Sequence, residues 1–164
     1  MAGTTVTIEF DAQSALGALT RAAGAMSDPA PLLGELGEEL LDIHAQRFRD
    51  QISPLGDPWA PLQPWYQAQK QKNADKVLTL DGYLRNLLHW QIRAGELLFG
   101  TNVIYGAIHQ FGGTIKPKTA GALNVGGHLV RQVVIPARPW LGVSVAEREW
   151  LLEVARQHIE SLIR

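Results

Sequence analysis

The sequence contains no cysteine, so neither a disulfide bond nor a thiolate metal site can contribute to its fold. It also has no excess of one charge, because 15 Lys and Arg stand against 16 Asp and Glu. A protein that binds nucleic acid tightly usually carries a basic surface that displaces counterions from the phosphates. The balanced charge therefore argues against nucleic acid as a main partner.

Long apolar runs are missing as well. None approaches the roughly 18 residues that a membrane span requires. The first ten residues, MAGTTVTIEF, lack the basic segment and apolar core of a signal peptide. We therefore expect a protein that has no membrane partner and stays in the compartment where it is made.

Charged residues are scarce, at 19% of the chain against about 25% in typical folded domains. A chain of 164 residues can form one domain and can bury roughly two-thirds of its unfolded surface without a disulfide or a metal. The thin polar coverage suggests a surface that partners cover, although a slightly apolar monomer has the same composition. Composition alone leaves both interpretations open.

Hydrophobic periodicity predicts one α+β domain over residues 1–164, in which a small, mostly antiparallel sheet packs against a long helix and a C-terminal helix. Residues 5–10 alternate apolar and polar side chains, as a half-buried strand does. One helix is expected after Asp11. The long helix is expected to start at Ser27-Asp28-Pro29 and to carry Arg47 on its inner face.

The middle of the chain predicts shorter elements. Residues 63–73 predict a short polar helix, and Asp81 is placed to cap another. A hairpin is predicted over residues 90–101, followed by a short helix or turn over 103–111. The inner face of the capped helix is expected to consist of three leucines: Leu84, Leu87 and Leu88.

Residues 112–128 contain five glycines and no periodic apolar face. Structureless loops longer than about 12–15 residues are uncommon in compact domains, so this segment predicts a flexible arm or a hairpin. A strand over residues 130–135 is expected to end at Pro136. Ser144 and Glu147 then form a capping box for the last helix.

Motifs for catalysis or cofactor binding are incomplete. Residues 142–146, GVSVA, are close to the G-x-S-x-G nucleophile elbow, but the histidine and acids that follow lie on the same expected helix as Ser144. Residues 121–127 imitate a phosphate loop, yet Gly127 and His128 stand where lysine and then serine or threonine are required. No two histidines have the i, i+4 spacing of metal ligands. We expect no catalytic residue, cofactor or metal, and a small serine hydrolase using Ser144 is the weakest alternative.

Three segments carry a resemblance to a known family. They are residues 57–62, DPWAPL, residues 105–113, YGAIHQFGG, and residues 135–142, IPARPWLG. In this order and spacing they resemble the virion-morphogenesis, or tail-completion, family of Mu-like and related contractile-tailed phages, over residues 28–164. One departure is Trp140, which stands where the family pattern has phenylalanine.

The resemblance implies a structural phage protein, not an enzyme, that acts in tail completion or head–tail (neck) joining through protein–protein assembly. Its expected partners are other tail and neck proteins and further copies of itself, in a possible ring. The expected location is the virion, after assembly in the host cytoplasm, in an infectious phage or a prophage. A nucleic-acid-associated assembly factor is the alternative.

The residues expected at a protein interface lie in three loops. Pro136 and Pro139 stiffen the chain around Arg138, and a pre-stiffened Arg beside Trp140 would lose little entropy on docking. The competing interpretation is a plain elbow between a strand and a helix, whose Trp140 fills the core. Trp59 is likewise interpreted either as an interface contact or as a side chain that covers the core. The remaining expected contacts are two lysines of the glycine-rich arm, Lys116 and Lys118.

The YGAIHQFGG segment predicts a structural turn. Gly112 and Gly113 follow an expected short helix, where a left-handed cap favours glycine. His109 and Gln110 are expected to form hydrogen bonds within that turn.

Overall fold

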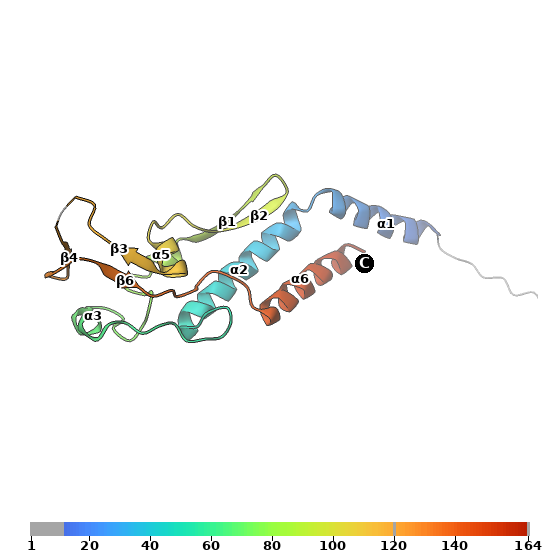
Figure 1. The fold of residues 1–164 in the computed structure, drawn as a ribbon. Helices are drawn as coiled ribbons and strands as arrows, with labels where there is room; N and C mark the ends of the chain where they lie inside the picture. Colours follow the sequence, from blue (N-terminus) through green and yellow to red (C-terminus); the bar gives the residue numbers. More distant parts are fainter. Residues whose placement is uncertain (1–11, 120, 164) are drawn as a thin grey trace, which may run out of the picture.

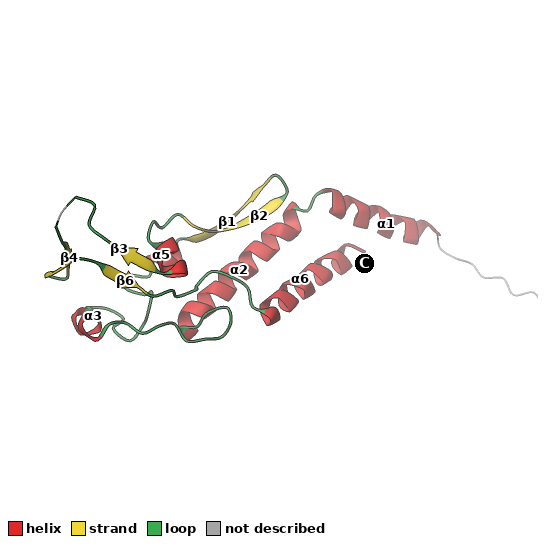
Figure 2. Cartoon of the chain, in the orientation of Figure 1, coloured by secondary structure: helices red, strands yellow, loops and turns green. Residues whose placement is uncertain are grey.

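The computed structural model describes residues 12–119 and 121–163. The strand expected at residues 5–10, and the cap expected from Asp11, lie outside the described residues. Three helices gather at one end of the chain's fold, and loops, short helices and short strands form the other end (Figures 1 and 2). None of the helices in the described part is both long and apolar enough to cross a membrane.

The helical end consists of α1 (Ala12–Ser27), α2 (Ala30–Asp50) and α6 (Val145–Ile163). Helix α6 packs against both α1 and α2. Helix α2 starts directly after Pro29, as expected, and ends where Gln51 adopts a left-handed conformation with φ 60°. Helices α2 and α6 confirm the expected long helix and the expected C-terminal helix.

A β-hairpin lies along α2. Strands β1 (Leu88–Arg93) and β2 (Glu96–Thr101) pair antiparallel, which confirms the expected hairpin. The contact depends on Gly37 of α2, because a Cβ at this position would lie 2.5 Å from the indole of Trp90. A helical glycine normally costs stability, and here it makes room for a tryptophan.

Three short helices connect the long ones. They are α3 (Pro64–Gln69), α4 (Tyr83–Asn86) and α5 (Gly106–Phe111). The expected cap at Asp81 is wrong: Gly82, with φ 82°, precedes α4, and the Asp81 carboxylate instead accepts a hydrogen bond from Lys72 at 2.9 Å. Leu84 and Leu88 are buried as expected, whereas Leu87 is 52% exposed, because the chain leaves the helix at this residue to enter β1.

The glycine-rich segment contains two of the remaining strands. Strand β3 (Gly113–Ile115) pairs with β6 (Val133–Ile135), and β4 (Leu123–Val125) pairs with β5 (His128–Val130) as a second hairpin. The single strand expected over residues 130–135 is therefore divided, because its first residue belongs to the hairpin and its last three to β6. With three two-stranded antiparallel sheets and six helices among the described residues, the fold is α+β.

The hydrophobic core is small and aromatic. It lies between the C-terminal half of α2, the loop at Trp59, the start of β1 and the segment before α6. Side chains from distant parts of the sequence meet there, so the core is closed by loops as much as by helices. Its buried members are Phe48, Trp59, Leu84, Leu88 and Trp140.

Candidate functional site

The segment between β6 and α6 is anchored to other parts of the chain by hydrogen bonds. Arg138 is only 6% exposed, and its guanidinium donates to the main-chain carbonyls of Ala60 at 2.7 Å and Pro61 at 2.9 Å. Its own N–H donates to the carbonyl of His109 at 2.7 Å. Arg138 therefore holds two loops of this chain together. The expectation that it projects from the surface as a contact residue is wrong, because the carbonyls of a proline-rich loop need a donor inside the fold.

Trp140 and Trp59 are also internal. Trp140 is 3% exposed, and its indole N–H donates to the carbonyl of Gly106 at 3.1 Å. The indole N–H of Trp59 donates to the carbonyl of Pro139 at 2.8 Å. Both rings pack beside Phe48. Of the two readings of these tryptophans, the core-filling one fits the structure, and neither side chain is accessible to a partner.

Gln110 positions the same segment from the opposite side. Its carbonyl oxygen Oε1 accepts hydrogen bonds from the N–H groups of Trp140 and Leu141, both at 2.9 Å. Its Nε2 group donates to the carbonyl of Leu141 at 3.0 Å. We expected Gln110 to bond within its own turn, and it bonds instead to residues about thirty positions away. The role is structural, as expected, but it is long-range.

Two glycines end helix α5 as the sequence predicts. Gly112 has φ 72°, and a Cβ there would lie 2.8 Å from the backbone nitrogen of Ala137. Gly113 has φ 156° and begins β3. The elbow that contains Pro136 and Pro139 therefore passes too close to α5 for any larger residue at position 112.

An ion pair between buried Arg47 and partly exposed Glu147 joins α2 to α6. Nη2 of Arg47 donates to both carboxylate oxygens of Glu147, at 2.8 and 2.7 Å. Its Nη1 donates to the carbonyls of Trp140 at 3.2 Å and Gly142 at 2.8 Å. Burial lowers the pKa of Arg47, and the adjacent Glu147 carboxylate opposes this change. The sequence signal for this pair was an arginine on the inner face of the long helix; its partner could not be identified from spacing.

Glu147 and Ser144 form the expected capping box. Oγ of Ser144 accepts a hydrogen bond from the N–H of Glu147 at 3.1 Å, and Oε2 of Glu147 accepts one from the N–H of Ser144 at 2.6 Å. His158 contacts Glu35 on α2 at 2.7 Å. Ser144 thus serves as a helix cap. The Glu147 carboxylate accepts from the main-chain N–H of Ser144 and from Arg47, and His158 pairs with Glu35, so neither side chain contacts the Ser144 hydroxyl as the base of a hydrolase would.

His44 is a buried histidine that sequence reasoning did not single out. Its Nδ1–H donates to the carbonyl of Leu40 at 2.7 Å, and its Nε2 accepts from the N–H of Gly142 at 3.4 Å. The ring also stacks against Phe99, with centroids 4.6 Å apart. Burial, helped by the nearby charge of Arg47, lowers the pKa of His44 to about 4. The imidazole is therefore neutral at pH 7.

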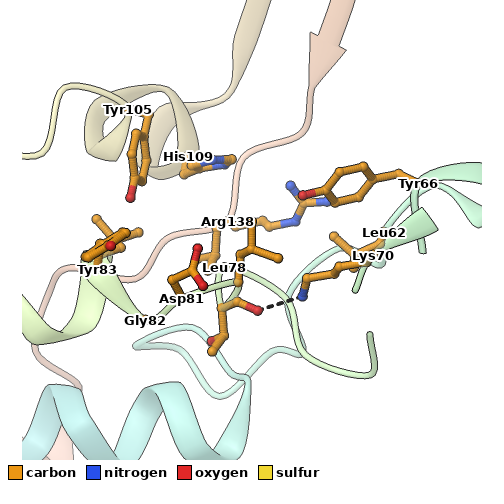
Figure 3. Close-up of a pocket in the computed structure, with 13 residues that line it drawn as sticks. Leu62, Tyr66, Lys70, Leu78, Asp81, Gly82, Tyr83, Tyr105, His109 and Arg138 are labelled. Carbon is orange, nitrogen blue, oxygen red and sulfur yellow. Dashed lines mark hydrogen bonds between the residues drawn. The ribbon is translucent and has the colours of Figure 1, made fainter. Parts of the chain in front are cut away.

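A cavity of about 310 Å³ lies between α3, the segment before α4, and α5 (Figure 3). Lys70 donates from its ammonium to three main-chain carbonyls, of Asn73 at 2.5 Å, Lys76 at 2.5 Å and Thr79 at 2.6 Å. Burial lowers the pKa of this lysine, while the charge of Asp75 raises it. Lys70 therefore has no hydrogen left to give a ligand.

His109 faces the same cavity beside Arg138 and Tyr105 (Figure 3). Its Nδ1 is buried and has no hydrogen-bond partner among the described residues. Burial and the positive charge of Arg138 both lower the pKa of His109. Main-chain carbonyls accept the hydrogen bonds of both cations in this cavity, Lys70 and Arg138, and Asp81 accepts one from Lys72. The charged side chains of the cavity thus support loops, and none of them forms a nucleophile with an adjacent base. Among the described residues no group of three or more His, Asp or Glu is placed to hold a metal.

Lys116 and Lys118 are exposed in the segment that leads to the β4–β5 hairpin. They remain predicted interface residues. Near the hairpin, an open groove of about 670 Å³ lies between α3 and strands β5 and β6. Its lining includes three exposed apolar residues: Trp65, Leu129 and Val134.

Comparison with known proteins identifies relatives and a family. The chain is 28% identical over 131 residues to the putative capsid assembly protein G of Escherichia phage Mu, which covers 76% of each chain. It is also 28% identical over 154 residues to the Mu-like prophage FluMu G protein 2 of Haemophilus influenzae, covering 94% of this chain and 95% of the relative. No solved structure matches the chain. The model of the phage virion morphogenesis family matches residues 10–160, and the protein belongs to that family.

Proposed function

We propose that the protein is a structural subunit that completes the phage tail or joins head and tail at the neck, by binding other virion proteins. The family and the relatives support a role in virion morphogenesis and assembly. The residues expected to be catalytic in a hydrolase are used as caps and ion pairs. The surface of the molecule is the feature that favours assembly.

The chain exposes more surface than a compact monomer of its mass. Its accessible area is 11,863 Å², whereas about 8,000 Å² is expected for 18.0 kDa. An allowance of about 2,000 Å² for the thirteen residues outside the described part still leaves a large excess. This excess is of the size that one subunit buries in an obligate interface. It is the observation that carries the proposal.

Large apolar side chains contribute to this surface at both ends of the molecule. Ile104 is 97% exposed and Leu129 is 76% exposed. Trp150 and Leu152 of α6 are exposed at the helical end. Exposed apolar groups of this size, when they are numerous, are typical of surfaces that partners cover.

The test is binding to the virion proteins encoded beside this chain. The purified protein is mixed in turn with the tail-tube, sheath and head-connector proteins of the same phage, and each mixture is followed by sedimentation velocity. We expect a stable complex with at least one of them, and hydrogen exchange should then slow at exposed apolar segments. Unchanged sedimentation and exchange with every one of these proteins would refute the proposal.

A further inference from the structure

The charges of this nearly neutral chain are segregated along the molecule. Residues 12–50 and 145–163, which form α1, α2 and α6, carry ten acidic and five basic side chains. Residues 61–140 carry nine basic and three acidic side chains. The only other charge in the described part is Asp57. The described residues are therefore neutral in sum, but they consist of an acidic part and a basic part.

Apart from the β1–β2 hairpin, the two parts lie toward opposite ends of the structure. Helices α1 and α6 and the N-terminal half of α2 lie at one end, and α3 with strands β3–β6 lies at the other (Figure 1). The β1–β2 hairpin extends along α2 and carries one charge of each sign at its tip, Arg93 and Glu96. We refer to the two ends as the acidic helical end and the basic strand end.

The acidic helical end presents an apolar stripe on α6. Val145 is 77% exposed, Leu152 62% and Ile159 43%. These residues are seven positions apart, so they lie in a line along one side of the helix. The opposite side of α6 faces the protein, since it carries the buried Val154 and the ion-paired Glu147. The stripe is thus an outward face with no cover among the described residues.

The basic strand end presents the apolar groove beside the β4–β5 hairpin. Trp65, Leu129 and Val134 line it, and its volume is about 670 Å³. Arg131 is exposed between β5 and β6, next to residues that line this groove. An apolar centre with charged residues around it is the usual composition of a protein interface.

We propose that these two surfaces form one contact between copies of this chain, in which the α6 stripe of one copy occupies the groove of the next. This inference rests on the proposed assembly function and names a partner and a surface for it. The opposite charges of the two ends attract one another and disfavour a contact between two like ends. Because the surfaces differ, each copy keeps one of them free, and the contact repeats to give a ring or a filament.

Two charge-reversed variants test the contact. In the first, Lys116→Glu, Lys118→Glu and Arg131→Glu reverse three charges of the basic strand end. In the second, Glu149→Lys and Glu160→Lys reverse charges on the outer side of α6. All five side chains are exposed in the single chain, so both variants should fold. Each variant alone should self-associate about tenfold more weakly than wild type in sedimentation velocity at low salt.

An equal mixture of the two variants provides the decisive measurement. At the five substituted positions beside the two contact surfaces, the first variant carries only acidic side chains and the second only basic ones, so the mixture should form alternating complexes that neither variant forms alone. The matched control exchanges the charges at the hairpin tip, Arg93→Glu with Glu96→Lys, and should associate like wild type. Leu152→Asp, which interrupts the apolar stripe, should weaken association without altering the melting temperature.

Three results would overturn the inference. The first is a wild-type chain that remains monomeric at every concentration tested, and the second is a mixture of variants that does not associate. The third is loss of duplex-DNA binding in the basic-end variant with unchanged self-association, which would assign that end to nucleic acid. In each case, binding of the monomer to another virion protein would leave the proposed function intact. Failure of the contact between copies can therefore be distinguished from failure of the proposed function.

Discussion

Arg47 and Glu147 are one hundred residues apart in the sequence, and one guanidinium nitrogen of Arg47 donates to both carboxylate oxygens of Glu147 in the first turn of α6. The same guanidinium binds two carbonyls of the elbow that leads into that helix. A single buried side chain therefore fixes both the position of α6 and the path of the chain before it.

Removal of the carboxylate should leave a buried cation without its partner. We expect Glu147→Gln to lower the free energy of unfolding by about 3 kcal/mol, because an unpaired buried charge is costly. Urea unfolding followed by tryptophan fluorescence measures this loss. Glu153→Gln, which removes the partner of Arg156 in an exposed pair on the same helix, is the control and should leave stability unchanged. Equal losses in the two variants would contradict the assignment.

The protein should lose stability in acid through His44. Its folded pKa of about 4 lies below the ordinary value of 6.5, so the unfolded chain takes up a proton first as the pH falls. The contribution of the neutral imidazole is complete above pH 6.5 and is lost progressively toward pH 4, amounting to about 3 kcal/mol. The slope of unfolding free energy against pH should be shallower in His44→Gln over this window. Parallel slopes would count against a buried neutral histidine.

Two glycines on neighbouring helices should respond to alanine with opposite signs. Gly37→Ala places a methyl group against the Trp90 indole and should destabilise the protein by about 2 kcal/mol. Gly24→Ala meets nothing within 4 Å and should stabilise α1 by up to about 1 kcal/mol. Thermal unfolding of the two variants measures both changes in stability. Destabilisation by both substitutions would mean that contact with the β1–β2 hairpin does not decide whether alanine stabilises or destabilises.

Substitutions at Ser144 distinguish a structural role of this serine from a catalytic one. Ser144→Ala removes the acceptor of the Glu147 N–H and should cost about 1 kcal/mol of stability. Ser144→Asp keeps an acceptor at the start of the helix and should recover most of that loss. Any esterase activity of the purified wild-type protein that disappears in both variants would instead support the hydrolase alternative.

Elements with a local cause could be predicted from the sequence. The capping box depends on two residues three positions apart, and the β1–β2 hairpin depends on alternation around Gly95, so both are visible in a short window. The cap at Asp81 failed for a local reason as well. The preceding position offered an acid, but Gly82 took the left-handed conformation that starts α4, and the carboxylate turned to Lys72.

The environment of Arg138 could not be predicted in this way. Two prolines stiffen the chain around an arginine equally well on a surface and in a core. What decides between them is the pair of carbonyls at Ala60 and Pro61, about eighty residues earlier, which have no partner unless Arg138 turns inward. Gln110 is a similar case, since its partners lie thirty residues later. Contacts between loops carry no periodic signal.

The ammonium of Lys70 gathers three carbonyls from residues 73–79, a stretch that contains neither helix nor strand. One ammonium group thus supplies hydrogen bonds to carbonyls that would pair with main-chain N–H groups in a helix or a sheet. Neutralising this single amine, for example by acetylation, would weaken all three contacts at once and loosen the segment, which would keep the hydrogen bonds of Asn73 to Leu80 and of Val77 to Gln51.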